Sequence, residues 1–180
     1  MAFLGFVLTK IFGSQIVHQY QLRAHKLKIS DKRLDDQMQM ATEVFEEISS
    51  LMDRRLYLER KLLYSHKDVK LRGLPDKTQD RFDEYNKFLY EWNSRMNINI
   101  CKVEQFYGAK LKTLLQDRIM KDFNWIGILL RRLHLQVDNI PSFEAINKSI
   151  DVTNERVYKI DQQMLKCLKS QNVGSFRNVD

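Results

Sequence analysis

Apolar residues recur at helical spacing along most of the chain. From about residue 29 to residue 65 they alternate steps of four and three, which is typical of a helix with one apolar seam. A more regular seam of the same kind follows residue 142. These patterns predict long amphipathic helices at both places. The positions are Leu34, Met38, Ala41, Phe45, Ile48 and Met52 in the first seam, and Phe143, Ile146, Ile150, Thr153, Val157, Ile160, Met164 and Cys167 in the second.

The first break in the helical pattern falls at residues 67–75, where Gly73 and Pro75 interrupt the chain. Asp76 then has the position of a helix N-cap, and Gln79 has the reciprocal position of a capping box. We therefore expect one helix to end before this break and the next to begin just after Asp76.

The pattern between residues 82 and 135 predicts either one long kinked helix or two helices, because it blurs near Asn97. Pro141 closes the loop that follows, and Ser142 can cap the last helix. No stretch alternates apolar and polar residues for long, and hairpin dipeptides such as Asn-Gly are absent. The predicted fold class is therefore all-α, with four or so helices forming a bundle.

The amino-terminal stretch Phe3–Tyr20 is predominantly apolar. As a helix it would span about 27 Å, close to the thickness of the hydrocarbon core of a bilayer. A signal peptide is not expected, because no positive charge precedes the stretch and no small-residue cleavage site follows it. The sequence therefore predicts an N-terminal membrane helix ahead of the bundle.

Polar residues within and just after this stretch fall on one face of the helix. Lys10, Ser14, His18 and Gln21, called here the polar stripe, lie at i, i+4, i+8 and i+11. A single copy in lipid would bear a cost of about 2.5 kcal/mol or more for the lysine alone, whereas several copies in a ring can turn the stripe toward water. Three interpretations stay open: an anchor lying in the membrane plane, a soluble helix packed on the bundle, and an oligomeric pore lined by the stripe.

Basic residues follow the apolar stretch directly. Arg23, Lys26 and Lys28 begin a cluster that holds five basic residues and one acidic residue between positions 21 and 33. Such a cluster favours anionic lipid head groups or nucleic acid, and its place beside an apolar segment favours lipid over a merely solvated helix face. The positive-inside rule then places the bulk of the protein in the cytoplasm, behind a single membrane pass.

The chain of 180 residues is long enough for one domain with a core of its own. We divide it into a transmembrane helix with a basic juxtamembrane segment (residues 1–28), a cytoplasmic helical bundle (29–171) and a loose tail (172–180). Cys101 and Cys167 stand alone, without a partner at redox or metal-ligand spacing, which indicates a reducing compartment. Neither a metal nor a cofactor is expected.

Most signatures of catalysis are absent from the sequence. It has no glycine-rich phosphate loop, no His-Glu-x-x-His and no Cys-x-x-Cys. The acidic residues Asp53, Glu59, Asp117 and Asp122 lack the Glu-x-x-His pattern of a di-iron bundle. We expect them to be solvated or paired with basic residues.

Arg60 and His66 form the one candidate catalytic pair. Their spacing fits the Arg-x4–6-His pattern of the HEPN ribonucleases, in which the arginine stabilises phosphate charge and the histidine handles the proton of the attacking 2′-hydroxyl. Six residues on a regular helix place two side chains about 120° apart, so the pair converges only if the helix ends between them. The next position is Lys61, where active members of that family carry a smaller polar residue.

Taken together, the N-terminal membrane helix, the helical body and the Arg60–His66 pair resemble the pore-forming accessory protein of type VI-B CRISPR systems. The resemblance implies a HEPN-like bundle that assembles as a homo-oligomer into a ring-shaped pore of the bacterial inner membrane, lined by the polar stripe. It also implies a functional link to an RNA-guided RNase and its guide RNA, whose antiviral action the pore enhances by depolarising the membrane. Arg60 and His66 are then vestigial, and the protein is not an enzyme.

Two other functions stay open. The first is a membrane-tethered HEPN-type ribonuclease that cleaves RNA through Arg60 and His66. The second is a non-catalytic helical interaction protein, in which the heptad seams mediate self-association or the docking of a partner.

Overall fold

The computed structural model describes residues 2–73 and 75–177, and for residues 2–17 and 71 it describes the backbone alone. The described residues form helices and no strands, so the predicted all-α class is confirmed. The elements are α1 (Ala2–Arg72), α2 (Thr78–Tyr107), α3 (Ala109–Leu114), a π-helical turn (Leu115–Ile119), α4 (Met120–His134), α5 (Phe143–Lys169) and a final 3₁₀ turn (Gly174–Phe176).

Helix α1 runs without interruption for 71 residues. It continues seven residues beyond the predicted end at Ser65, because no glycine or proline occurs between Gly13 and Gly73. Gly73 ends it in a left-handed conformation, with φ of 61°, and its amide donates to the Val69 carbonyl at 3.2 Å. A left-handed φ is a common way to terminate a helix, and glycine adopts it at no steric cost.

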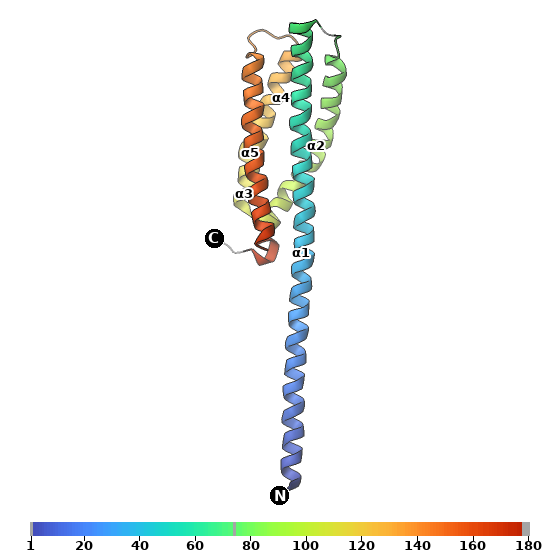
Figure 1. The fold of residues 1–180 in the computed structure, drawn as a ribbon, viewed down its shortest axis with the longest axis vertical. Coiled ribbons are helices and arrows are strands. Elements are labelled where there is room, and N and C mark those ends of the chain that lie inside the picture. The colour runs from blue at the N-terminus through green and yellow to red at the C-terminus, as the bar shows by residue number, and fades with distance from the viewer. Residues whose placement is uncertain (1, 74, 178–180) are drawn as a thin grey trace.

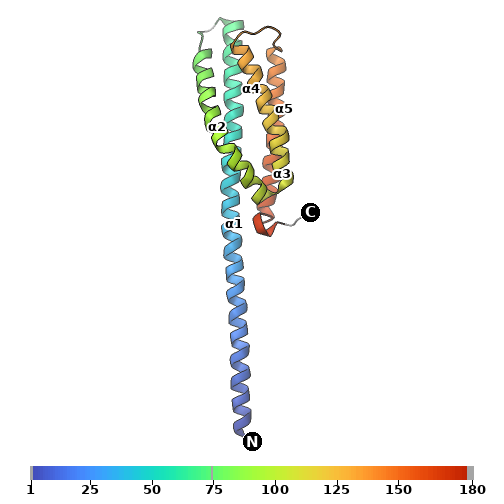
Figure 2. The same cartoon turned by 180° about the vertical axis from the view of Figure 1, so that it is seen from behind.

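The bundle is built from α1, α2, α4 and α5 around one hydrophobic core. Figures 1 and 2 show the C-terminal part of α1 flanked by α2 and α5, with α4 behind it in Figure 1 and in front of it in Figure 2. The seam predicted on α5 is confirmed, because its six central residues are all buried and Phe143 and Cys167 at its ends are partly buried. On α1, Ala41, Ile48 and Met52 are buried, whereas the seam residues between and before them are only partly covered.

Two helical stretches, not one kinked helix, cover the region between residues 78 and 134: α2, and a second stretch in which α3, the π-helical turn and α4 follow one another without a break. Gly108 separates α2 from α3 with φ of 97° and ψ of 163°, a conformation that is essentially restricted to glycine. Its amide donates to the carbonyls of Val103 and Glu104, both at 3.1 Å, which closes the end of α2. The chain then crosses the base of the bundle as α3 and returns along it as α4 (Figure 2).

The N-terminal part of α1 projects alone from the base of the bundle (Figure 1). Every residue from 18 to 33 is exposed, and Leu34 is the first that the bundle partly covers. Residues 2–33 amount to about 48 Å of free helix at 1.5 Å per residue. No helix in the described part of the chain includes a stretch long and apolar enough to cross a membrane.

The C-terminal segment differs from the loose tail that we predicted from residue 172. Val173 is fully buried, the Ser175 amide donates to Gln37 Oε1 at 3.2 Å, and Arg177 Nη1 donates to the Glu104 carbonyl at 2.8 Å. Residues 172–177 therefore close the base of the bundle between α1 and α2. The polar sequence of the segment gives no sign of this packing. Residues 178–180 lie outside the described residues.

The two predicted caps have different outcomes. Ser142 caps α5 as expected, because its Oγ accepts a hydrogen bond from the Ala145 amide at 3.2 Å. The capping box at the start of α2 is wrong, because Gln79 donates to Asp83 at 2.9 Å and does not reach back. Asp76 instead binds the first helical residue, accepting from both the amide and the hydroxyl of Thr78.

Candidate functional site

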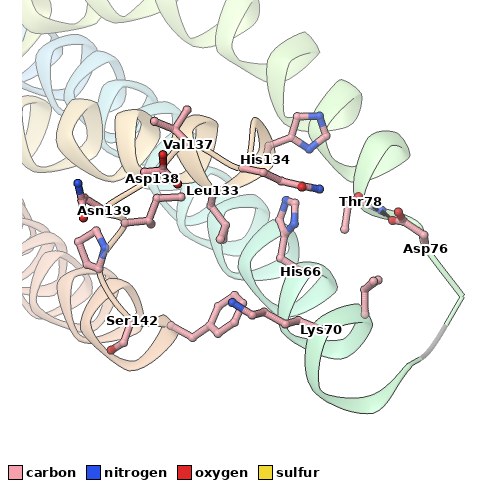
Figure 3. Close-up of a pocket in the computed structure, with 15 residues that line it drawn as sticks. His66, Lys70, Asp76, Thr78, Leu133, His134, Val137, Asp138, Asn139 and Ser142 are labelled. Atoms are coloured by element: carbon pink, nitrogen blue, oxygen red, sulfur yellow. Dashed lines mark hydrogen bonds between the residues drawn. The ribbon is translucent and has the colours of Figure 1, made fainter.

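A polar cavity of about 620 Å³ lies at the tip of the bundle, at the end opposite the N-terminus. Three connections meet there: the last turn of α1, the loop that leads into α2, and the loop from α4 to α5 (Figure 3). We call it the tip pocket. Its polar lining includes His66, Lys70, Asp76, Thr78, His134 and Ser142.

Two histidines from different helices meet in the tip pocket. The rings of His66 on α1 and His134 on α4 are 5.5 Å apart between centroids and nearly perpendicular, and Phe82 stacks on the other side of His134 at 3.9 Å. His66 Nε2 and His134 Nδ1 are buried and have no hydrogen-bond partner within the described residues. Buried polar atoms without partners are uncommon in folded proteins, so these two nitrogens are an unusual feature of the tip pocket.

The electrostatics of the tip pocket favour a neutral His66. Burial lowers its pKa below the usual value, and the neighbouring His134 lowers it further, while Asp76 acts in the opposite direction. The pKa of Asp76 is itself held low, chiefly by the hydrogen bonds from Thr78. Beside the Asp76 carboxylate, a neutral His66 can take up a proton, and a positive charge on one of two adjacent imidazoles disfavours a positive charge on the other.

The charges of the pocket exclude some ligands. Lys70 is offset by the carboxylates of Asp76 and Asp138, so the fixed charge does not favour an anion such as phosphate. Within the described residues, no three histidine, cysteine or acidic side chains are arranged to hold a metal ion.

The structure does not bring Arg60 and His66 together. Because α1 remains helical as far as Arg72, the two side chains point to different sides of it. Arg60 Nη2 binds Asp151 Oδ1 of α5 at 3.0 Å, whereas His66 faces His134 of α4. The helix end between them that convergence requires is absent.

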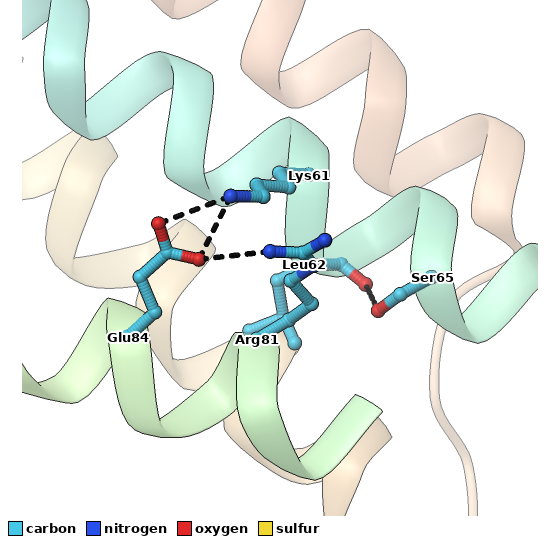
Figure 4. Close-up of polar contacts among 5 residues, drawn as sticks. All are labelled: Lys61, Leu62, Ser65, Arg81 and Glu84. Atoms are coloured by element: carbon cyan, nitrogen blue, oxygen red, sulfur yellow. Dashed lines mark hydrogen bonds and ion pairs between the residues drawn. The ribbon is translucent and has the colours of Figure 1, made fainter. Parts of the chain in front are cut away.

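Lys61 contributes to the contact between α1 and α2 (Figure 4). Its Nζ lies 3.0 and 2.8 Å from the two carboxylate oxygens of Glu84, and Arg81 binds the same carboxylate at 3.2 Å. These partners, Lys61 first, lower the pKa of Glu84. The residue that departs from the HEPN pattern therefore has a structural contact of its own.

The residues proposed to meet the membrane fall on the projecting part of α1. Of the polar stripe, the side chains of Lys10 and Ser14 lie outside the described residues, and His18 and Gln21 are exposed. The candidate head-group ligands Arg23, Lys26 and Lys28 are exposed as well.

A charged network inside the core was not predicted from the sequence. Glu59 is fully buried and accepts hydrogen bonds from Arg55 Nε at 3.1 Å and from the Tyr85 hydroxyl at 3.2 Å. The guanidinium of Arg55 lies over the rings of both Trp92 and Phe123, 4.6 and 4.7 Å from their centroids. The one available signal was the i, i+4 spacing of Arg55 and Glu59.

The other acidic residues considered for a metal site are exposed or paired. Asp53 is exposed, Asp117 pairs with Lys121, and Asp122 pairs with Arg156 of α5. With Glu59 buried beside Arg55, these four carboxylates point to separate places in the fold.

The fold and the site define an all-α bundle that carries a histidine-lined pocket at one end and a long free helix at the other. The chain matches no known protein family, no curated protein and no solved structure.

Proposed function

We propose that the protein docks to a membrane through the free part of α1 and assembles there into an oligomeric pore. The observation that carries this proposal is the projection of α1, in which every side chain from residue 18 to residue 33 is exposed. Tyr20 is 68% exposed and Leu27 is 65% exposed. Exposed apolar groups on a helical segment that the other described residues do not cover favour a second environment that covers them.

The charge of the free helix favours an anionic membrane surface as that environment. Five basic residues lie between positions 21 and 33 against one acidic residue. Basic residues near a membrane surface contribute about 1 kcal/mol each to binding anionic lipid.

The helix geometry of residues 20–33 supports an upright stalk and argues against a helix lying in the membrane plane. Tyr20 and Leu27 share one side of the helix, and Leu22 and Ile29 share the opposite side, since each pair is seven residues apart. An in-plane anchor needs a single apolar face. With apolar and basic residues on all sides, the segment suits the crossing from lipid to water.

Assembly follows from the polar stripe within the segment that enters the membrane. One copy alone would expose Lys10 to lipid, at a cost of about 2.5 kcal/mol or more. In a ring of copies the stripe turns toward a water-filled centre, and the apolar side turns toward lipid. Gly5 and Gly13 permit close approach of neighbouring helices.

The setting of this pore is proposed from the resemblance to the accessory proteins of type VI-B CRISPR systems. The protein would act in the bacterial inner membrane, where an open pore depolarises the infected cell and strengthens the action of an RNA-guided RNase. The separation of Arg60 from His66, and the ion pair of Arg60 with Asp151, support a structural role for the HEPN-like pair.

Liposomes of anionic lipid that carry the purified protein test the proposal by release of a trapped ion-sensitive dye. We expect release by the full chain and none after deletion of residues 1–20. The matched control is His66→Ala, which alters the bundle tip and leaves the free helix intact, and we expect it to release dye. Release that survives the deletion would overturn the pore. RNA cleavage by the full chain that is lost in His66→Ala would instead favour the tethered ribonuclease.

A further inference from the structure

The outer side of α4 has an exposed apolar stripe of its own. Its residues repeat at steps of four, three, four and three, so they lie on one face of the helix. Trp125 is 54% exposed and Leu135 is 63% exposed, and Ile128 lies between them with a similar exposure. We call this face the α4 ridge: Lys121, Trp125, Ile128, Arg132 and Leu135.

The α4 ridge is not needed to hold α4 in the bundle. The opposite face of the helix is fully buried through Phe123, Ile126, Leu129 and Leu130. A helix with a second apolar face, including a half-exposed tryptophan, is typical of a surface that packs against another protein. Arg132 adds a positive charge between the apolar side chains of the ridge, whereas Lys121 is paired with Asp117.

A groove of complementary charge lies along α1 and α5. It is a cavity of about 440 Å³, lined by Asp53 of α1 and by Glu155, Tyr158 and Asp161 of α5 among others. We call it the acidic groove. Its three carboxylates face one lysine, Lys159.

The described residues offset the negative charge of the acidic groove only in part, through Lys159. Asp161 accepts a hydrogen bond from the Ser49 hydroxyl at 2.7 Å, but no cation binds it within the described residues. Burial raises the pKa of Asp161, and the neighbouring Asp53 carboxylate raises it as well, against the hydrogen bond from Ser49. A basic group entering the groove would relieve this repulsion.

The ridge and the groove lie on different sides of the bundle. Figure 1 shows α1 and α5 side by side toward the viewer, and the reverse view in Figure 2 shows α4 in front. One copy therefore has both surfaces free at once.

We infer that the α4 ridge of one copy packs into the acidic groove of the next, head to tail. Trp125 would supply the apolar anchor and Arg132 the charge that meets Glu155 and Asp161. Head-to-tail contacts of this kind produce closed rings when the rotation between copies closes. If neighbouring bundles stand parallel, their free helices project on one side, as a membrane assembly requires. This inference rests on the proposed oligomer and names the surfaces that build it.

A charge exchange tests the interface with the full chain in detergent, by light scattering of the protein mass. Arg132→Glu and Glu155→Lys should each dissociate the assembly, by a factor of ten or more in the concentration of half-association. Mixed in equal amounts they should associate again, because each variant supplies the complement that the other needs. Lys87→Glu, an exposed charge reversal on α2, is the matched control and should leave the mass unchanged. Trp125→Ala should weaken association without any change of charge.

The outcomes separate this inference from the pore. Single variants that keep the wild-type mass, or a mixture that stays dissociated, would overturn the interface even if the liposomes release dye. A wild-type assembly that leaves liposomes sealed would overturn the pore, while the mixture still decides the interface. A wild-type chain with the mass of one copy would overturn both.

Discussion

Arg55 and Glu59 form an ion pair one helical turn apart, with 3.1 Å between Nε and Oε1, inside a part of the core closed to solvent. Arg55 also donates from Nη2 to the Phe123 carbonyl at 2.9 Å, whereas Glu59 Oε2 has no partner in the described structure. Burial raises the pKa of Glu59 to about 7, against the opposing effect of Arg55. A carboxyl group so placed makes stability depend on pH in an unusual direction.

We expect the free energy of unfolding to fall as pH rises from about 4.5 to about 7, through the contribution of Glu59. Over this window the native protein keeps the proton that the unfolded chain releases, so each step up in pH favours unfolding. The contribution amounts to at most about 3 kcal/mol. Urea unfolding at pH 5 and pH 8 measures it.

Glu59→Gln isolates this contribution, because glutamine mimics the protonated acid and does not titrate. The loss of stability between pH 5 and pH 8 should be smaller in the variant than in the wild type. Equal losses in the two proteins would show that Glu59 is ionised throughout.

His66 gives a pH dependence of opposite sign. Burial and His134 lower its pKa, so below pH 6.5 the unfolded chain binds a proton that the native protein resists. Its contribution to stability is therefore present above pH 6.5 and is lost as the pH falls through that value. His66→Leu should lessen the loss between pH 7 and pH 5, measured by thermal unfolding. An unchanged pH profile would contradict the close contact of the two histidines.

Gly108→Ala should destabilise the bundle by about 1–3 kcal/mol, because a side chain at this φ and ψ is strained. An added Cβ would also lie 3.2 Å from Arg177 Nη1. Combining the change with Arg177→Ala separates the two causes. The penalty should persist in the double variant, since backbone strain dominates; its disappearance would assign the effect to Arg177.

Gln171→Gly should stabilise the protein by roughly 1 kcal/mol. Gln171 lies just past α5 with φ of 54°, and the following amide, of Asn172, returns to the Cys167 carbonyl at 2.9 Å. Glycine is the usual residue at this place in a helix end. The matched control is Gln163→Gly, the same change at an exposed position inside α5, which should destabilise by about 0.5 kcal/mol. Chemical unfolding that shows one sign for both would refute the argument.

The fold was predictable where the signal is local. The α5 seam from Ile146 to Met164 and the Ser142 cap depend on spacing and on one side chain, and both are as expected. The end of α1 was misplaced because the break was predicted over residues 67–75, although no residue that ends a helix precedes Gly73 there. The packing of Val173 depends on a neighbour far away in the sequence, which no local pattern records.

The site was less predictable, because its contacts join distant parts of the chain. His66 was identified, but its neighbours His134 and Phe82 come from other helices and follow no spacing rule relative to it. The pairing of Arg60 with His66 assumed a helix end that the structure does not have. Arg60 instead binds Asp151, 91 residues further along the chain.

The unbroken course of α1 couples rotation at one end of the molecule to rotation at the other. No glycine or proline lies between Gly13 and Gly73, so no hinge interrupts the helix there. A rotation of the bundle about the axis of α1 would therefore rotate the N-terminal segment with it. Successive residues are about 100° apart around the axis. A twist of that size would replace the face that His18 and Gln21 present with the next one around the helix.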